Sequence, residues 1–330
     1  MDVQFQVSGV GHCVGSRIVS NRDLAISLGL EPNWFETRTG ISHRRICADG
    51  EDVLQMAREA VSRACIDAGL AKSSLGHETV LLHIQNGLTH LTPPPGIILC
   101  NALGFERVRS LSIDGVCSEP INALEIAALM LSNSMCERVI ISASVDFVRM
   151  INPTDLDTVG LFGAGAGALI LETCPQDSPS GLKGLYWENH TKYWDLGIIH
   201  LLQHTQGNEE VSIKFGYYVM KGTELARVTL KSISKVLDCV LNQAEWKLKD
   251  IDFMITHQPN VKMLKIGIKK LKIPSTKIDL PVVELGNMGP ASLLVALSMA
   301  KEKKRINQQS KVLLVSFGLG FSCSAAALVL

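Results

Sequence analysis

The second part of this chain repeats the first. Residues 64–85, ACIDAGLAKSSLGHETVLLHIQ, resemble residues 237–258, LDCVLNQAEWKLKDIDFMITHQ, in the order helix end, loop and buried strand. The later apolar runs ERVIISAS and SKVLLVSF are separated by the same offset along the chain. Several matches in order at nearly one offset indicate duplicated units. The sequence therefore predicts two halves, residues 1–172 and 173–330.

Within each half, strands alternate with helices, which predicts an α/β fold with mostly parallel sheets. Each half closes with a Gly-rich turn and an apolar strand, at residues 162–172 and 317–330. The stretch 289–300 is almost free of charge and predicts a helix between two sheets. Together these features predict layers in the order α-β-α-β-α. Equivalent strand ends should then converge near a pseudo-twofold axis, where α/β sites form.

The composition excludes several classes of protein. Lys plus Arg equals Asp plus Glu at 32 each, so no global charge attracts nucleic acid or an acidic membrane. The nine cysteines form no CxxC pair and no cluster with histidine, which argues against disulfides or a metal site and fits a reducing cytoplasm. No signal peptide is recognisable, and no apolar run reaches the roughly 18 residues of a membrane span. We therefore expect a cytoplasmic protein without nucleic-acid or membrane partners.

Three polar residues follow buried strands at related positions of the repeat. Cys117 comes between a strand and a helix N-terminus, whose partial positive charge and free N–H groups favour a thiolate nucleophile. His257 and Asn287 end two strands of the second half, and Asn287 corresponds to Cys117 at nearly the repeat offset. Taken singly, they fit a buried core cysteine, a structural histidine and an unusual turn. Jointly they suit acyl transfer to sulfur, with the imidazole and carboxamide donating hydrogen bonds to a thioester oxygen.

Six motifs in order resemble those of β-ketoacyl-acyl-carrier-protein synthase III, a family of thiolase-like condensing enzymes. The resemblance covers nearly the whole chain and implies the thiolase-like five-layer α-β-α-β-α fold. The motifs are NWFETRTGISHRRI (33–46), GVCSE (115–119), NPTD (152–155) followed by FGAGAGALILE (162–172), THQPN (256–260), LGNMGPAS (285–292) and FGLGF (317–321).

The resemblance also implies a two-step mechanism. Cys117 takes an acyl group from a thioester, and His257 and Asn287 stabilise the enolate of a second thioester, malonyl or β-ketoacyl. The backbone N–H groups of Cys117 and Gly320 are expected to hold the oxyanion. Substrates arrive on phosphopantetheine, on an acyl carrier protein or coenzyme A, and no permanently bound cofactor or metal is expected. The family implies a homodimer or a close heterodimer in which a loop of one subunit helps to form the other's tunnel.

One departure from the family pattern concerns the donor thioester. In the family an arginine after PTD and the tryptophan of the first motif sandwich the adenine of coenzyme A. Here Trp34 and Arg38 of the first motif remain, but Leu156 replaces that arginine. We therefore expect a carrier-bound donor, docked on one face of a basic helix at 261–273, although such a face can also be merely solvated. Its lysines are Lys262, Lys265, Lys269 and Lys272.

Two further departures lie close to the nucleophile. Glu119 is two residues after Cys117, where the family has small residues. It suits the helix dipole, but it is also a candidate to lower the nucleophilicity of Cys117 or to remove an α-proton. The loop TPPPG, residues 92–96, is stiffened by three prolines, and residues around Leu91 are candidates to gate a longer acyl pocket. These departures favour polyketide or natural-product assembly over housekeeping fatty-acid initiation.

The sequence thus predicts an enzyme that forms a carbon–carbon bond by Claisen condensation. One alternative is an acyltransferase that moves the Cys117-bound acyl group to an alcohol or amine. A second is a non-catalytic subunit of a condensing heterodimer. The intact pair of His257 and Asn287 favours condensation, because simple transfer needs no enolate stabilisation, and the retention of all three polar residues argues against the non-catalytic subunit.

Overall fold

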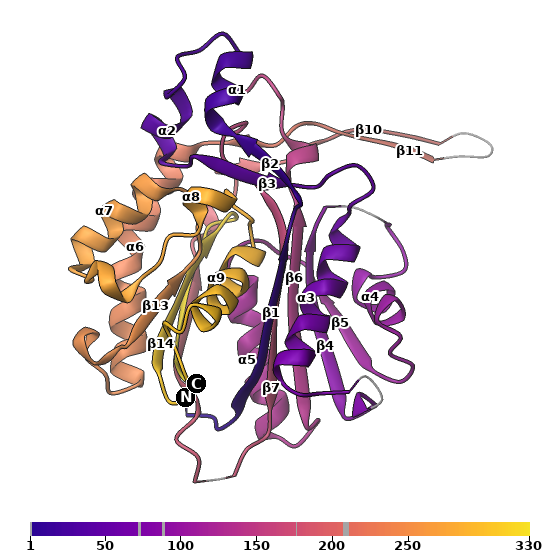
Figure 1. Ribbon diagram of the computed structural model, residues 1–330, viewed down its shortest axis with the longest axis vertical. Helices are drawn as coiled ribbons and strands as arrows, with labels where there is room; N and C mark the ends of the chain where they lie inside the picture. Colours follow the sequence, from indigo (N-terminus) through magenta and orange to yellow (C-terminus); the bar gives the residue numbers. More distant parts are fainter. Residues whose placement is uncertain (1, 72–73, 88–89, 176, 207–210) are drawn as a thin grey trace.

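Two sheets organise the structure, a computed structural model that describes residues 2–71, 74–87, 90–175, 177–206 and 211–330 (Figure 1). The first sheet has five strands, which lie in the order β1 (Gln6–Val14), β7 (Ala164–Glu172), β6 (Arg138–Asp146), β4 (Thr79–Asn86) and β5 (Arg109–Ile113). The second has four, in the order β8 (Gly181–Asn189), β15 (Ser322–Val329), β14 (Lys311–Gly318) and β13 (Phe253–Thr256).

The strand pairing of one sheet repeats that of the other. In the first sheet β1–β7 and β7–β6 are antiparallel, whereas β6–β4 and β4–β5 are parallel. In the second sheet β8–β15 and β15–β14 are antiparallel and β14–β13 is parallel. The counterpart of β5 is reduced to one parallel bridge between Met254 and Ile278. The sequence repeat therefore corresponds to a structural repeat, with the last strand of the second copy almost lost.

The prediction of mostly parallel sheets is wrong. Among the seven strand pairs just described, four are antiparallel. The reason lies in the connections, because parallel neighbours need a long crossover, usually a helix. Only residues 319–321 separate β14 from β15, and between β6 and β7 the chain forms no more helix than the short turn η2 (Val148–Met150).

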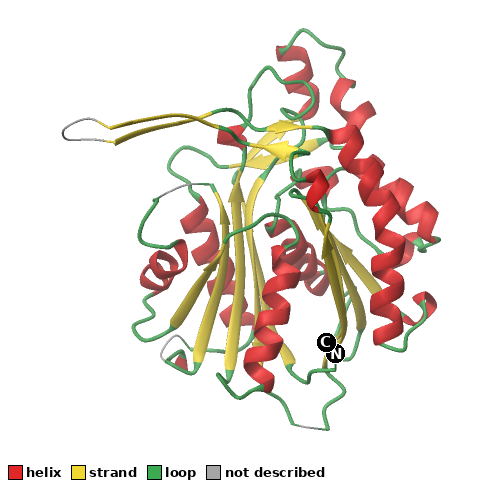
Figure 2. Ribbon diagram, turned by 180° about the vertical axis from the view of Figure 1, so that it is seen from behind, coloured by secondary structure: helices red, strands yellow, loops and turns green. Residues whose placement is uncertain are grey.

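The helices form three layers around the sheets, which confirms the predicted α-β-α-β-α arrangement (Figures 1 and 2). The middle layer consists of α5 (Glu119–Ser132) and α9 (Ala291–Glu302), and each contacts strands of both sheets. The predicted buried helix at 289–300 is α9. The outer layers are α3 (Val53–Asp67) with α4 (Pro95–Leu103) over the first sheet, and α6 (Gly222–Gln243) with α7 (Val261–Leu271) over the second.

A cap covers one end of the layers, and both termini lie at the other end (Figure 1). The cap consists of α1 (Asn21–Ser27), α2 (Trp34–Thr39), α8 (Val282–Leu285) and the paired strands β2 (Arg17–Ser20) and β3 (His43–Ile46). A hairpin of β10 (Leu201–Gln206) and β11 (Val211–Phe215) projects from this end. The remaining short elements are β9 (Gly197–Ile198), β12 (Val219–Met220), η3 (Thr191–Tyr193), η4 (Leu248–Asp250) and η5 (Ser275–Lys277).

One hydrophobic core joins the two sheets. It contains Leu124 of α5 and Leu294 of α9 together with Val139 of the first sheet and Leu328 of the second, all at most 2% exposed. The predicted boundary after residue 172 falls between β7 and β8, and the division into two halves stays a prediction. Because the halves share this core, we expect neither to fold without the other.

Close packing of β7 on α9 generates a stability prediction. A Cβ atom on Gly167 would lie 2.5 Å from Leu294 Cβ and 2.8 Å from Val295 N, so Gly167→Ala should push the sheet and the middle helix apart. We expect the free energy of unfolding to fall by about 1–3 kcal/mol. The measurement is denaturant unfolding followed by circular dichroism.

The matched control is the same substitution at Gly267 in α7. There the nearest atom to an added Cβ is Leu230 Cδ2 at 3.7 Å, an ordinary contact. Because alanine is a better helix former, Gly267→Ala should stabilise the protein by up to about 1 kcal/mol. Equal effects of the two substitutions would contradict the tight contact between β7 and α9.

Candidate active site

Cys117, His257 and Asn287 line one cavity of about 360 Å³ beneath the cap. Cys117 follows β5 and His257 follows β13, whereas Asn287 lies between the short helix α8 and α9, so the prediction that it ends a strand is wrong. Residues of the cap, of α6 and of α7 complete the walls. The structure thus brings together the three polar residues that the sequence repeat singled out, although they come from distant segments of the chain.

Contacts from the second sheet hold the backbone around Cys117. The Ser316 hydroxyl donates to the Cys117 carbonyl at 2.5 Å, and the hydroxyls of Ser118 and Ser322 are hydrogen-bonded to each other. A Cβ on Gly318 would lie 3.2 Å from Cys117 N, so a glycine allows β14 to approach this closely. Helix α5 begins at Glu119, which leaves Cys117 just before its first turn.

The resting state of Cys117 differs from the sequence prediction. Burial raises the pKa of the Cys117 thiol to about 12, and the charge of Glu119 adds to the increase. The helix N-terminus was expected to favour the thiolate, but desolvation is the larger effect here. Cys117 is therefore a neutral thiol near pH 7, and any attack by its sulfur would require the loss of this proton.

His257 is a neutral imidazole in this cavity. Burial lowers the pKa of His257 to about 3, against an opposing interaction with the Gly289 backbone. The ring meets Phe317 edge to face, with centroids 5.2 Å apart, and the backbone N–H of His257 donates to the Val315 carbonyl at 2.8 Å. Within the described ranges, His257 Nδ1 is buried without a hydrogen-bond partner. A neutral imidazole in this state can donate a hydrogen bond to substrate without adding a positive charge.

Backbone contacts orient the side chain of Asn287. Its Oδ1 accepts the Gly289 N–H at 2.9 Å, which leaves the NH2 group as the donor available to a ligand. The Asn287 N–H donates to the Leu161 carbonyl at 2.8 Å, and the Asn287 carbonyl accepts from Gly163 at 2.9 Å. Gly286 and Gly289 have left-handed backbone angles, but Asn287 does not. The backbone of Asn287 is therefore not left-handed, but the hydrogen bond from Gly289 to Oδ1 closes an Asx-turn, which agrees with the interpretation of Asn287 as a turn residue.

The backbone donors nearest to the cavity differ in part from those predicted. Gly318 and Leu319 line the cavity with Cys117, whereas Gly320 does not, and a Cβ on Gly320 would meet no atom within 4 Å. Among the described residues, the Leu319 N–H has no acceptor, and the Cys117 N–H has none apart from its own sulfur. The position of Leu319 makes it a better candidate than Gly320 for the second oxyanion donor.

The cavity mouth contains Arg38 but not the ring of Trp34. Arg38 and Leu156 are lining residues, and Trp34 is not. The Arg38 guanidinium stacks on the Trp34 ring, with Cζ 3.1 Å from the ring centroid. One face of Trp34 is therefore already covered, which leaves it less suited to an adenine sandwich.

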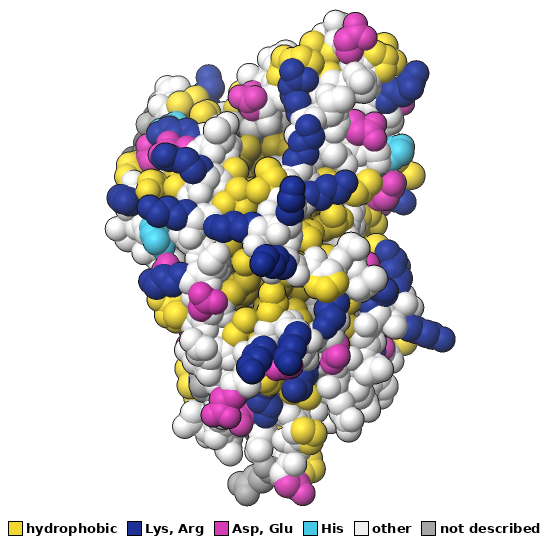
Figure 3. Space-filling view, turned by 90° about the vertical axis from the view of Figure 1, so that its left-hand side faces the viewer, with side chains coloured by type: hydrophobic (Ala, Val, Ile, Leu, Met, Phe, Trp, Pro, Cys, Tyr) yellow, Lys and Arg dark blue, Asp and Glu magenta, His cyan; other side chains and the backbone are white. Residues whose placement is uncertain are grey.

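The predicted basic face is shorter than expected. Helix α7 ends at Leu271, and Lys272 is its C-cap with a left-handed backbone (φ 54°), so Lys272 does not continue the helical face. Lys262, Lys265 and Lys269 are exposed on α7. Figure 3 shows this side of the molecule, on which Lys and Arg side chains are spread around a hydrophobic hollow.

Glu119 lies near Cys117, whose pKa its charge raises, but its side chain is engaged within its own segment. Its Oε2 accepts from Asn122 Nδ2 at 3.1 Å, and its Cγ lies 2.1 Å from where a Cβ on Gly115 would be. Burial and the charge of Asp114 raise the pKa of Glu119. It is not among the residues that line the cavity, so a role as a base for substrate has no support from its position.

The proposed gating loop was predicted around Leu91. Residues 88–89 lie outside the described residues, and Leu91 is 73% exposed and does not line the cavity of this single chain. Asn86, at the start of the loop, donates from Nδ2 to the Gly115 carbonyl at 3.0 Å. This contact connects the loop to the turn that carries Cys117.

Sequence reasoning missed the aromatic lining of the cavity. Phe162 and Tyr218 both line it and meet edge to face, with ring centroids 5.5 Å apart. Phe162 belongs to a motif quoted above for its glycines, whereas Tyr218 lies in no motif. The pair of adjacent tyrosines at 217 and 218 was the only signal, and it does not say which of the two is buried.

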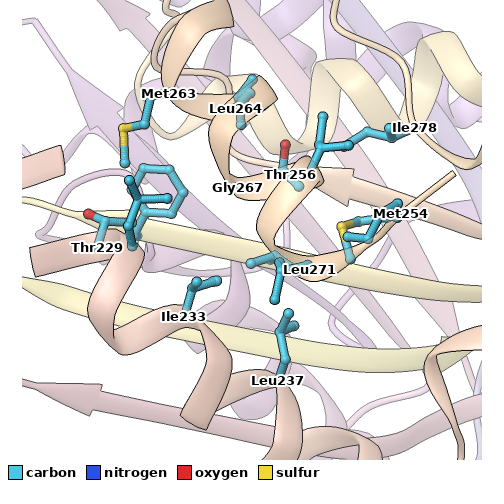
Figure 4. Close-up of a pocket in the computed structure, with 15 residues that line it drawn as sticks. Thr229, Ile233, Leu237, Met254, Thr256, Met263, Leu264, Gly267, Leu271 and Ile278 are labelled. Carbon is cyan, nitrogen blue, oxygen red and sulfur yellow. The ribbon is translucent and has the colours of Figure 1, made fainter. Parts of the chain in front are cut away.

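A second, apolar cavity lies directly behind the first, between α6, α7 and β13 (Figure 4). Met263 and Phe317 line both cavities. The Thr229 hydroxyl at its wall donates to the Leu225 carbonyl at 2.8 Å, and Thr256 Oγ1 accepts from Gln258 at 3.3 Å. The other side chains that line it are apolar, so this cavity suits an apolar group.

Neither a metal cluster nor a membrane-spanning helix is found in the described part of the chain. No group of three or more His, Cys, Asp or Glu side chains there is arranged to hold a metal ion. No helix among the described residues has the length and apolar character needed to cross a membrane.

Comparisons with known proteins agree with this fold. Residues 111–188 match the family model for 3-oxoacyl-[acyl-carrier-protein] synthase III, and residues 241–330 match the model for its C-terminal part. The β-ketoacyl-[acyl-carrier-protein] synthase III of Chelativorans sp. is 29% identical over 326 residues, which cover 99% of each chain. The crystal structure of 3-oxoacyl-[acyl-carrier-protein] synthase III from Aquifex aeolicus superposes on this chain with a TM-score of 0.88 at 25% identity. The superposition covers 99% of this chain and 100% of that one.

A structural neighbour with a different role has the same fold. The priming β-ketosynthase of the R1128 polyketide pathway superposes with a TM-score of 0.84 at 23% identity, over 98% of this chain and 96% of that one. The fold and the two segments that match the family models define a thiolase-like condensing enzyme. The two family models together match just over half of the chain, and the chain belongs to the β-ketoacyl-acyl-carrier-protein synthase III family.

The neutral Cys117 thiol predicts an unusual pH dependence of alkylation. Because its pKa is raised to about 12, the thiolate fraction should grow by about tenfold per pH unit through neutral and alkaline pH. The rate of iodoacetamide alkylation, measured by mass spectrometry of the Cys117 peptide from pH 6 to 10, should rise without a plateau. His257 adds no inflection, because its pKa lies near 3. A plateau that begins near pH 7 would indicate a stabilised thiolate and contradict the neutral thiol.

Proposed function

We propose that this enzyme joins a Cys117-bound acyl group to a malonyl or β-ketoacyl thioester by Claisen condensation, in natural-product or fatty-acid-type biosynthesis. The observation that supports this proposal most is the common cavity of Cys117, His257 and Asn287. A nucleophile and two N–H donors around one space suit an acyl-enzyme followed by attack of an enolate.

In the first step, Cys117 sulfur attacks the thioester carbonyl and the pantetheine sulfur leaves. Because Cys117 begins as a neutral thiol, its proton must be transferred as the new C–S bond forms, and it ends on the departing pantetheine thiol. The N–H groups of Cys117 and Leu319 are candidates to stabilise the negative oxygen of the tetrahedral intermediate. This assignment replaces Gly320 with its neighbour.

In the second step, His257 and Asn287 donate to the carbonyl oxygen of the acceptor thioester. Loss of CO2, or transfer of an α-proton to water, leaves an enolate, whose negative oxygen these donors stabilise. The carbanion attacks the Cys117 thioester, and the thiolate of Cys117 leaves and regains a proton. A neutral imidazole with a pKa near 3 suits donation rather than proton abstraction. Glu119 does not line the cavity, which argues against it as the base.

We infer that substrates arrive on phosphopantetheine and that no cofactor is permanently bound. The lysines of α7 follow His257 in the chain and are candidates to dock an acidic carrier protein. Leu156 at the cavity and the Arg38-covered ring of Trp34 weaken the alternative, a coenzyme A donor held by its adenine. The scattered cysteines, none of them in a disulfide among the described residues, suit a reducing compartment, and we propose a cytoplasmic location.

We further propose a dimer built on the free edge of the five-stranded sheet. Strand β5 is the last strand of that sheet, and Leu111 on it is 47% exposed. Ile97 on the neighbouring helix α4 is 52% exposed. An edge strand with apolar side chains is a surface that proteins cover, and a second copy covers it by symmetric pairing. Such a partner would also approach the loop around Leu91.

The two steps can be separated by mutation. Cys117→Ala should abolish the acyl adduct on intact-mass spectrometry after incubation with an acyl-carrier thioester. His257→Ala and Asn287→Ala should still form the adduct, but product formation should fall by about 10²–10³, because each removes a donor to the enolate. Product is measured by liquid chromatography and mass spectrometry.

His77→Ala is the matched control, because His77 is a solvent-exposed histidine with 80% of its side chain accessible. It should acylate and condense at the wild-type rate. If His257→Ala and Asn287→Ala instead transferred the acyl group to an alcohol or amine at nearly the wild-type rate, the acyltransferase alternative would be correct.

Carrier docking generates a separate prediction. Lys265→Glu with Lys269→Glu should slow acylation from a carrier-bound donor by about tenfold at low salt and leave acylation from a simple pantetheine thioester nearly unchanged. The effect should fade as the Debye length shortens toward about 8 Å at physiological ionic strength. Lys303→Glu, an exposed position after α9, is the control. Equal slowing of both donors would show that the lysines do not act through the carrier.

A further inference from the structure

Tyr218 places a hydroxyl in the catalytic cavity. The residue is 3% exposed, yet it lines the same cavity as Cys117. No described residue exchanges a hydrogen bond with this hydroxyl, although buried tyrosines normally have a partner for their O–H. The natural partner of this hydroxyl is therefore expected to be a ligand.

The ring of Tyr218 is held in place by aromatic neighbours. It meets Phe147 edge to face at 5.4 Å and Phe162 at 5.5 Å, and the Tyr218 N–H donates to the Met150 carbonyl at 2.8 Å. A Cβ on Gly197 would lie 2.8 Å from the Tyr218 oxygen and 2.4 Å from Leu319 Cδ2, so only a glycine fits against the hydroxyl on that side. A ring held from two sides cannot easily turn to find another partner.

The chemistry of the hydroxyl decides what it can bind. Burial and the neighbouring Cys117 raise the pKa of Tyr218 above its usual value, so the phenol keeps its proton and is a hydrogen-bond donor. An unsubstituted alkyl chain on Cys117 would displace water and leave this donor unpaired, at a cost in binding free energy. An oxygen atom on the chain would pair with it.

We propose that Tyr218 forms a subsite for an oxygen atom on the Cys117-bound acyl chain, and that the preferred donor is a 3-oxoacyl thioester rather than a saturated one. This inference rests on the proposed function, because it requires that Cys117 carry the acyl group. It goes beyond that function by naming the class of donor and the residue that selects it. Both substrates of the condensation would then be oxygenated.

The test compares 3-oxooctanoyl with octanoyl pantetheine thioesters in wild-type enzyme, Tyr218→Phe and Tyr217→Phe. The readout is the single-turnover rate of Cys117 acylation by intact-mass spectrometry. Tyr218→Phe should slow acylation by the 3-oxo thioester about tenfold and change the octanoyl rate less than about twofold, because only one hydrogen bond is removed. Tyr217 is 54% exposed and provides the matched control, which should behave as wild type.

The outcomes separate the two levels of the proposal. If Tyr218→Phe slows Cys117 acylation equally for both thioesters, or does not slow it, the oxygen subsite is overturned. The acylation of Cys117 would still stand. A second outcome is a wild-type enzyme that is alkylated at Cys117, and so is intact, and yet is acylated by neither thioester. That result would overturn the proposed function and the subsite with it. A loss of selectivity confined to Tyr218→Phe supports the inference.

Discussion

The middle layer of two helices is the constraint on which the structure depends. Helices α5 and α9 are covered by a sheet on each side, so nearly every side chain of α9 is buried and none of its first ten residues is charged. Glycines in β7 allow this helix to approach the sheet within contact distance. Because Cys117 lies just before α5 and Asn287 just before α9, the packing of this layer also fixes the relative position of the two residues.

Burial governs the electrostatics of the site. It raises the pKa of Cys117 and lowers that of His257, so both groups are neutral at pH 7 and the two do not form a thiolate–imidazolium pair in the resting cavity. In the proposed mechanism, a neutral thiol is protected from adventitious reaction until a thioester supplies the electrophile. The N–H donors around the cavity would then act on the negative charge that develops during the reaction, in a medium where water does not weaken them.

Much of the fold was predictable from the repeat. Its nearly constant offset identified equivalent strands, and the uncharged stretch at 289–300 identified the buried helix. Strand direction was not predictable in the same way, because periodicity reports burial and not pairing. The prediction failed where a short connection, residues 319–321, leaves no room for a crossover. The prediction that Lys272 lies on the same helical face as the other lysines is wrong, because residue spacing cannot reveal a left-handed C-cap.

The sequence by itself determined the family, the layered architecture and the identities of Cys117, His257 and Asn287 as candidates, because motif order and repeat offset are properties of the chain. Only the tertiary structure decided the protonation states, the presence of Leu319 rather than Gly320 at the cavity wall and the presence of Tyr218 in the cavity. These features depend on desolvation and on which groups from distant segments share one space. No local pattern specifies them, because the segments meet only when the two sheets close on the middle helices.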